Sequence, residues 1–215
     1  MAQPVTQTPL APPLSRISNP VPIGVAGFAL TTFTLGLYTA GIFNPKGMVV
    51  VFALAAFYGG LTQFIAGFFA LARGDLFPAA FMTTYGAFWF TLVALYLYVI
   101  PHAGPVAGPQ AAGVYLIMWS VITFIFLIAT LFTNWPVFIT FAEFMLTLII
   151  LDLATLGGMT GLTTVGGYLE MVLGALAWMI VAGEIINDVS GRALVPFPVT
   201  PFHHLPTVAG EPESR

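Results

Sequence analysis

Residues 76–142 form a continuous stretch without a single Asp, Glu, Lys or Arg. The whole chain of 215 residues is 59% hydrophobic and 6% charged, whereas soluble domains carry about 25% charged residues. So few charges cannot cover the surface of a soluble fold, and the chain is therefore expected to lie in a lipid bilayer. The formal net charge of −3 offers no basic footprint for a nucleic acid, so no nucleic acid is expected as a partner.

Apolar segments follow one another between clusters of Gly, Pro and Asn. Each is long enough to supply the roughly 20 residues that a membrane-spanning helix needs. They cover residues 21–43, 47–72, 78–100, 111–132, 136–156 and 165–189. The segments are about twice as long as a barrel strand and show no alternation of apolar and polar residues. We therefore predict an all-α membrane protein, a bundle of six transmembrane helices, and not a β-barrel.

This prediction divides the chain into three regions. Residues 1–18, rich in Pro and Thr, are predicted to be a disordered N-terminal tail, residues 19–196 the transmembrane domain, and residues 197–215 a C-terminal tail. Six spans bring both ends to the same side. Most basic residues fall on that side, namely Arg16, Arg73, Arg192 and Arg215, and only Lys46 lies opposite. The positive-inside rule then places both termini in the cytoplasm, with the chain in the plasma (inner) membrane.

Acidic residues interrupt the last two apolar segments: Glu143, Asp152, Glu170 and Glu184. No Lys or Arg within a segment can pair with them, so each is expected to be protonated, hydrogen-bonded or in contact with water. Glu143 and Asp152 are nine residues apart, which places them on opposite faces of one helix. A role in a proton relay and hydrogen bonding between helices are both open for these acids.

Enzyme chemistry finds little support in the sequence. There is no cysteine, and His102, His203 and His204 lie in a loop and a tail with nothing nearby to complete a metal site. The chain lacks a Walker loop, a dinucleotide-binding glycine motif, HExxH and Gly-x-Ser-x-Gly. No cofactor, metal ion or catalytic residue is therefore expected, and the protein is predicted not to be an enzyme.

The start of the first segment, Asn19-Pro20-Val21-Pro22-Ile23-Gly24-Val25, resembles the NPAPLGL signature of the acetate uptake transporter family, which includes the bacterial succinate/acetate permeases. Further matches follow in the family's order: Phe57-Tyr58-Gly59-Gly60 with Gln63 and Gly67, Thr84-Tyr85-Gly86-Ala87-Phe88-Trp89, Gly113-Val114-Tyr115-Leu116 and Gly183-Glu184-Ile185-Ile186-Asn187. The resemblance covers about residues 19–196.

The resemblance implies a six-helix protomer that assembles as a homohexamer. Each protomer would hold its own channel-like path for acetate and other small monocarboxylates, and transport in the family is commonly described as proton-coupled. The expected partners are thus acetate or a similar small carboxylate, protons, further copies of the chain and membrane lipid. The family's hydrophobic constriction corresponds to Phe28, Tyr85 and Phe144. The family often has leucine in place of Phe144, so a bulkier neck and a preference for acetate over dicarboxylates such as succinate are expected.

Helix geometry independently supports a constriction at these residues. Each follows a proline near the start of its segment by six, seven or eight residues, hence about 9 to 12 Å into helices that begin on the same side. Three rings at one depth would form a dewetted neck. We predict a substrate site and vestibule beside it from polar and entrance residues of the matched segments: Asn19, Pro20, Thr31, Tyr58 and Gln63.

A dry neck opposes the passage of an unpaired carboxylate. Acetate is therefore predicted to pass with a proton or as the acid, with Glu143 and Glu170 as possible proton-relay residues. Two other functions fit the same residues, namely a passive channel for anions or small solutes and a membrane sensor or scaffold.

Overall fold

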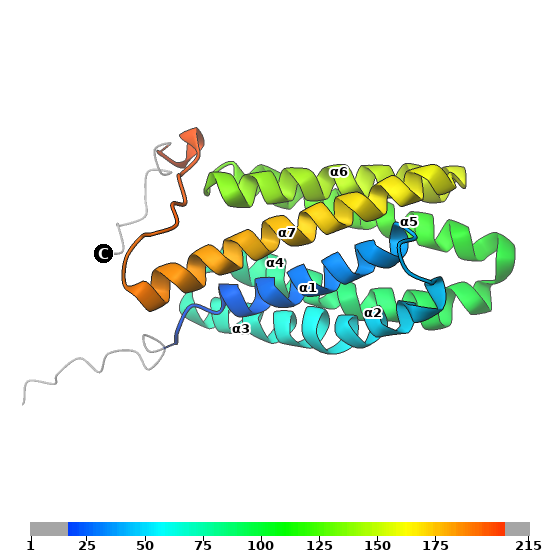
Figure 1. The fold of residues 1–215 in the computed structure, drawn as a ribbon, viewed down its shortest axis with the longest axis horizontal. Helices are drawn as coiled ribbons and strands as arrows, with labels where there is room; N and C mark the ends of the chain where they lie inside the picture. Colours follow the sequence, from blue (N-terminus) through cyan, green and yellow to red (C-terminus); the bar gives the residue numbers. More distant parts are fainter. Residues whose placement is uncertain (1–16, 205–215) are drawn as a thin grey trace, which may run out of the picture.

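The computed structural model describes residues 17–204, and in this part the chain is helical, with one isolated β-bridge between Asn134 and Val199. Its α-helices are α1 (Val21–Thr39), α2 (Val49–Leu54), α3 (Gln63–Arg73), α4 (Leu76–Ala94), α5 (Ile100–Thr130), α6 (Trp135–Gly157) and α7 (Thr160–Ser190). Short 3-10 helices are η2 (Pro45–Met48) and η5 (Pro201–His204), and π-helical segments are η3 (Ala55–Thr62) and η4 (Leu95–Val99). The helices run roughly along one long axis (Figure 1). The all-α prediction is confirmed for these residues.

Several helical stretches are long and apolar enough to cross a membrane. By length and composition they are Val21–Thr39, Pro45–Arg73, Leu76–Thr130, Trp135–Gly157 and Thr160–Ser190. They begin and end within a few residues of most of the predicted segments. The exception is Leu76–Thr130, which covers both the third and the fourth predicted segment.

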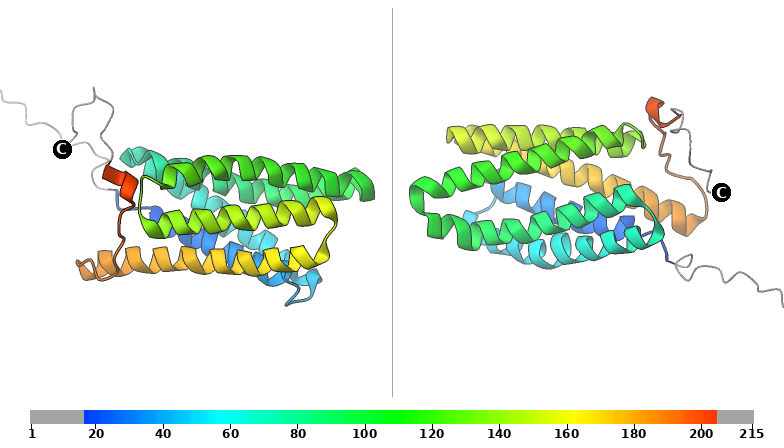
Figure 2. Two further views of the ribbon diagram at one scale, coloured as in Figure 1. Left: turned by 90° about the horizontal axis from the view of Figure 1, so that it is seen from above. Right: turned by 180° about the vertical axis from the view of Figure 1, so that it is seen from behind.

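The chain turns back within Leu76–Thr130 at a single residue, Gly104, whose φ of 80° and ψ of −177° are not helical. Figure 2 shows the chain doubling back within this stretch, in the part drawn in green. Only glycine adopts this backbone conformation without strain. Pro105 follows directly and suits the first turn of the returning helix, where its missing N–H is not needed. The sequence predicts a loop between residues 100 and 111; this is wrong, because the chain is helical on both sides of Gly104.

The second predicted segment is also more complex than expected. It is one continuous helical stretch in which the π-helical η3 separates α2 from α3. The wider π turn leaves backbone carbonyls without their usual partners, and Thr62 Oγ1 donates to Phe57 O at 3.1 Å. Hydrophobic patterning identifies such a stretch as a helix but does not distinguish its turns.

The described ends of the chain lie at the same end of the bundle, where α1, α4 and α6 begin (Figure 1). Of the predicted C-terminal tail, residues 197–204 lie against the α5–α6 connection: Thr200 Oγ1 donates to Leu131 O, and Trp135 N donates to Pro198 O at 2.9 Å. The predicted disordered tail falls almost wholly on residues 1–16, which lie outside the described part, as do residues 205–215.

Helix α1 packs closely on α7, and this contact fixes the centre of the bundle. A Cβ atom on Gly167 of α7 would lie 2.1 Å from the backbone nitrogen of Ala40. The two backbones can approach only because a glycine stands there. This close packing sets the position of Phe28 in the middle of α1, relative to the helices around it.

Candidate functional site

Helices α1, α4 and α6 bring the three predicted constriction residues into contact. The ring centroids of Phe28 and Tyr85 are 6.1 Å apart, those of Phe28 and Phe144 5.5 Å, and those of Tyr85 and Phe144 5.1 Å. All three side chains are buried. The three rings, hereafter the ring triad, thus form one layer across the inside of the bundle.

Cavities lie on the two sides of the ring triad. The vestibule, of about 290 Å³, opens towards the end of the bundle where α1, α4 and α6 begin, and the far cavity, of about 110 Å³, lies towards the other end. Phe28 and Phe144 line both cavities, and Tyr85 lines the vestibule. The ring triad therefore separates two internal spaces that would otherwise meet.

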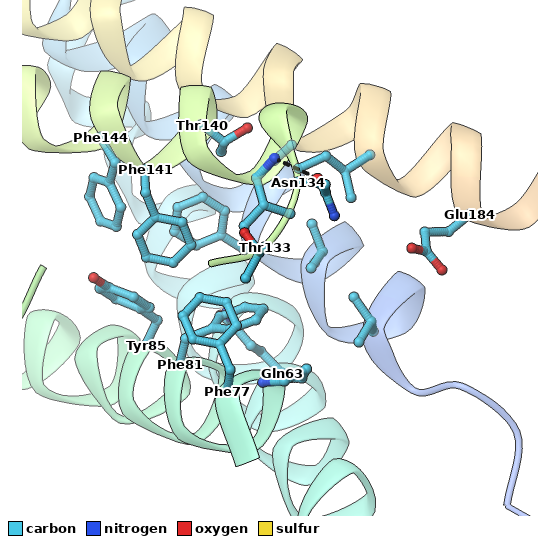
Figure 3. Close-up of a pocket in the computed structure, with 17 residues that line it drawn as sticks. Gln63, Phe77, Phe81, Tyr85, Thr133, Asn134, Thr140, Phe141, Phe144 and Glu184 are labelled. Atoms are coloured by element: carbon cyan, nitrogen blue, oxygen red, sulfur yellow. Dashed lines mark hydrogen bonds between the residues drawn. The ribbon is translucent and has the colours of Figure 1, made fainter. Parts of the chain in front are cut away.

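The vestibule is mainly apolar, with several aromatic rings and a few polar groups on its wall (Figure 3). Its rings include Phe77, Phe81 and Phe141. Gln63 is 1% exposed, and its Oε1 has no hydrogen-bond partner within residues 17–204. Glu184 lies nearer the mouth (Figure 3). A buried amide oxygen without a partner is costly, so Gln63 is suited to bind water or a polar solute in this space.

The aromatic residues of α4 follow the line from one cavity to the other. Phe81 lines the vestibule, Tyr85 belongs to the ring triad and Trp89 lines the far cavity. They are four residues apart and so share one helix face. Stripes of this kind usually pack against neighbouring helices, and here the same stripe also lines the internal spaces.

The hydroxyl of Tyr85 points away from the cavities to α5. It lies 2.8 Å from Thr123 Oγ1, and Thr123 donates its own hydrogen to Trp119 O at 2.7 Å. Tyr85 is therefore the donor of the first bond. Thr123 holds the ring of Tyr85 in its orientation, a role that the sequence does not indicate, because apolar helices commonly contain threonine.

Other predicted vestibule residues lie elsewhere. Asn19 and Tyr58 line a neighbouring cavity of about 550 Å³, and Glu184 lines both this cavity and the vestibule. Asn19 Nδ2 donates to Glu184 Oε2 at 2.8 Å, and Asn19 Oδ1 accepts from Val21 N at 3.1 Å. Asn19 thus bonds the first residue of α1 and joins the start of α1 to the end of α7.

Pro20 and Thr31 are buried between helices. The carbonyl of Pro20 accepts from Ile23 N at 3.1 Å in the first turn of α1. Thr31 faces Gly59 of η3, and its Oγ1 has no partner among the described residues. Of the five predicted vestibule residues, the structure therefore brings Gln63 to the vestibule itself and places Asn19 and Tyr58 next to it.

The acids in the middle of α6 and α7, unlike Glu184, lie on the other side of the ring triad or away from both cavities. Glu170 lines the far cavity. Glu143 Oε1 accepts from Thr147 Oγ1 at 2.9 Å, and Thr147 also lines the far cavity. Asp152 accepts from Ser120 Oγ at 2.7 Å, which joins α6 to α5. The structure thus brings Glu143 and Glu170 near the same cavity and keeps Asp152 apart.

Neither cavity is lined by a lysine or an arginine. In the described part of the chain, the one ion pair joins Arg73 and Asp75 at 2.9 Å, at the end of the bundle. No group of three or more His, Asp or Glu residues within 17–204 could hold a metal ion. A carboxylate that entered the ring triad would therefore meet no cation.

A family model described as the GPR1/FUN34/yaaH family matches residues 3–203. This chain belongs to the GPR1/FUN34/yaaH family. The finding confirms the resemblance to acetate uptake transporters. The succinate-acetate/proton symporter SatP of Escherichia coli K12 is 33% identical over 186 residues, which cover 85% of this chain and 96% of the relative.

Two further proteins are similar to this chain. The solved structure of the bacterial acetate channel SatP matches with a TM-score of 0.78 and 31% identity, covering 85% of this chain and 99% of that one. The ammonia transport outward protein 2 of Saccharomyces cerevisiae is 35% identical over 181 residues, covering 79% of this chain and 62% of that protein. The match to this solved structure supports the helical arrangement that forms the ring triad.

Proposed function

We propose that this protein transports acetate and other small monocarboxylates across the plasma (inner) membrane, together with a proton, through a path inside each protomer. The observation that supports the proposal most directly is the ring triad, the layer of aromatic side chains that separates the two internal cavities. The Escherichia coli relative named a succinate-acetate/proton symporter supplies the substrate class.

In this mechanism the vestibule collects the substrate and the ring triad selects the form that crosses. Gln63, with its unpartnered amide oxygen, and the adjacent Asn19 and Tyr58 supply the polar contacts. The rings exclude water, and no basic residue lines either cavity to compensate a carboxylate. Desolvating an unpaired carboxylate costs several kcal/mol more than desolvating the neutral acid. The substrate therefore crosses as the neutral acid, and Glu143 and Glu170 are the candidates for exchanging its proton.

The proposed assembly follows the family. Residues 19–196 form a six-span domain with both termini in the cytoplasm, since the chain turns back at Gly104, and residues 1–18 and 197–215 form tails. Protomers associate as a homohexamer in membrane lipid, with no cofactor.

Uptake of labelled acetate into proteoliposomes, with and without an imposed pH gradient, tests this function. Accumulation that follows the gradient and saturates with acetate is expected. Equal uptake with and without the gradient would refute proton coupling, and no uptake above protein-free vesicles would refute acetate transport altogether.

A passive acetate channel is the second candidate, because a single layer of rings separates the cavities and a solved relative is described as an acetate channel. Its signature is current carried by acetate that does not saturate. Electrical recording from the same proteoliposomes, fused to a planar bilayer, separates this outcome from electrically silent movement of the acid with its proton.

A further inference from the structure

The segment that follows α7 is seated on the end of that helix. This segment, residues 195–203 and hereafter the strap, passes from the end of α7 to the start of α6 (Figure 1). Asn187 of α7 binds the strap with both polar atoms of its amide: Nδ2 donates to Val195 O and Oδ1 accepts from Val195 N, each at 2.8 Å. The side chains of Val195 and Phe197 lie directly over the buried Gly183 of α7.

The other end of the strap binds the connection between α5 and α6. Helix ends leave backbone carbonyl and N–H groups without partners inside the helix, and here the strap provides those partners. Thr200 N donates to Thr133 O at 3.1 Å, and the Thr200 hydroxyl donates to Leu131 O. The first N–H group of α6, that of Trp135, donates to Pro198 O at 2.9 Å. The strap therefore holds the end of α5 and the start of α6 in place.

Both ends of the strap lie next to walls of the vestibule. Thr133 and Asn134, in the connection that the strap binds, line the vestibule. Glu184 of α7 also lines it and lies in the sequence between Gly183 and Asn187, which bind the strap. No residue of the strap itself lines the vestibule. The strap thus ties two walls of this cavity together from outside it.

The strap is held much more weakly than the helices that it joins. Among residues 195–203, Thr200 alone is buried, Val195 and Phe197 are partly buried, and the others are exposed. Segments with few buried apolar contacts and with hydrogen bonds near water open locally more readily than a packed core. The strap can therefore come away from its seats while the bundle stays folded.

We propose that the strap gates the vestibule. While it is bonded, it holds the end of α7 and the start of α6 together and keeps the mouth of the vestibule narrow. Its release lets the two walls separate and widens the mouth. This adds to the transport function proposed above a step that controls entry at this end of the bundle, before the ring triad is reached.

Two substitutions loosen the strap without changing the lining of the vestibule. A Cβ atom on Gly183 would lie 2.6 Å from the ring of Phe197 and 2.9 Å from Val195 Cγ1. Both contacts are with the tips of strap side chains, and alanine favours a helix more than glycine does, so Gly183→Ala displaces the strap and leaves α7 intact. Thr200→Val removes the hydroxyl bond to Leu131 O.

Access to the vestibule is measured at Thr140→Cys, because Thr140 lines this cavity and the chain has no cysteine. The purified full chain in detergent is labelled with N-ethylmaleimide or with the bulkier fluorescein maleimide. Gly183→Ala and Thr200→Val are each expected to raise the ratio of the bulky to the small labelling rate about fivefold, the change in an opening equilibrium when one hydrogen bond is lost.

Matched controls should leave this ratio unchanged. Gly161→Ala makes the same change at the other end of α7, where the added Cβ meets nothing within 4 Å. Thr34→Val removes a hydroxyl that bonds Leu30 O of its own helix at 2.7 Å.

A disulfide can also lock the strap in its bonded position. Asn134 and Val199 face each other in an antiparallel bridge, and the backbone bonds lie on either side of this pair. The Cα atoms of such a pair are about 4.5 Å apart, which a disulfide can span. In proteoliposomes, the oxidised Asn134→Cys/Val199→Cys protein is expected to take up labelled acetate several-fold more slowly than the same protein after dithiothreitol. The reduced form is the control for the loss of Asn134.

An unchanged labelling ratio in both Gly183→Ala and Thr200→Val would overturn the gating role of the strap. Equal acetate uptake by the oxidised and reduced double variant would show that the strap does not open during transport, and would overturn the gate as well. Only the uptake comparison rests on the proposed transport function. Wild-type vesicles without uptake would refute that function, whereas the labelling ratio would still decide whether the strap controls the mouth.

Discussion

The ring and the hydroxyl group of Tyr85 contact different neighbours. Its ring contacts Phe28 and Phe144, and its hydroxyl bonds to Thr123 of α5. Because the hydroxyl is held outside the cavities, Tyr85 presents an aromatic face to the path and not a polar group. The neck is therefore apolar, although one of its three residues carries a hydroxyl.

Removing the hydroxyl of Tyr85 is expected to cost little. Tyr85→Phe leaves Thr123 still bonded to Trp119 O, so the free energy of unfolding should fall by about 1 kcal/mol. Thr123→Val instead leaves the Tyr85 hydroxyl buried and unpaired and should cost about 1–3 kcal/mol. Unfolding of the purified variants in mixed micelles measures both. The double variant should lose less than the sum of the two, and strict additivity would show that the bond contributes nothing.

The size of the Phe144 ring is expected to limit the substrate. Phe144→Leu removes the ring whose centroid lies 5.1 Å from that of Tyr85 and 5.5 Å from that of Phe28. The variant should raise acetate flux and the rate of succinate uptake relative to acetate uptake. Uptake of both acids in proteoliposomes gives the ratio. Phe68→Leu, which changes an exposed ring on the outer face of α3, is the matched control. An unchanged ratio in Phe144→Leu would remove Phe144 from the selective layer.

The sequence predicts the ring triad because helices that begin at one level carry their residues to calculable depths. For that reason the sequence alone predicts that Phe28 and Phe144 lie at the same depth in the bundle. Depth does not determine the direction of a side chain, however: the sequence predicts Asn19 and Tyr58 in the vestibule, and they line the cavity beside it. The sequence does not predict the contacts of Tyr85 with Thr123 and of Asn19 with Glu184, since each joins residues far apart in the chain.

Among the elements, the turn within α5 depends on one residue. Patterning locates the apolar runs on either side but not the point of reversal, because Pro101, Pro105 and Pro109 all suggest a loop. The prolines instead lie within helical turns, and the reversal takes place at Gly104. The π-helical segments are not visible to patterning either, since a run of nearly continuous apolar residues does not reveal the number of residues per turn.

Gly104→Ala is expected to destabilise this hairpin. A side chain at φ 80° and ψ −177° strains the backbone by about 1–3 kcal/mol, even though nothing lies within 4 Å of the added Cβ. Gly161→Ala, in the first turn of α7, also meets nothing within 4 Å and has no unusual φ, so it should be neutral. Unfolding midpoints in detergent compare the two. Equal midpoints would mean that the hairpin tolerates a different backbone at residue 104.

At the scale of the whole molecule, both described ends of the chain meet at one end of the bundle. Residues after α7 pass to the α5–α6 connection, where Thr200 bonds Leu131 O and His203 Nδ1 lies 2.9 Å from Phe132 O. This segment joins helices that are far apart in the sequence, next to the Thr133 and Asn134 wall of the vestibule. The sequence predicts these residues only as a tail, because hydrogen bonds to backbone carbonyls leave no pattern in the sequence.

The proposed topology places this end in the cytoplasm and the α4–α5 and α6–α7 turns outside. The chain has no cysteine, so single cysteines at the exposed positions Ser190, Ala103 and Thr160 report their side without background. In intact cells a membrane-impermeant maleimide should label Ala103→Cys and Thr160→Cys, and should label Ser190→Cys only after permeabilisation. If Leu76–Thr130 crossed the membrane once, Ala103 would lie inside that span and resist labelling under both conditions. Labelling of Ser190→Cys in intact cells, with Thr160→Cys protected, would instead show that the chain has the opposite orientation in the membrane.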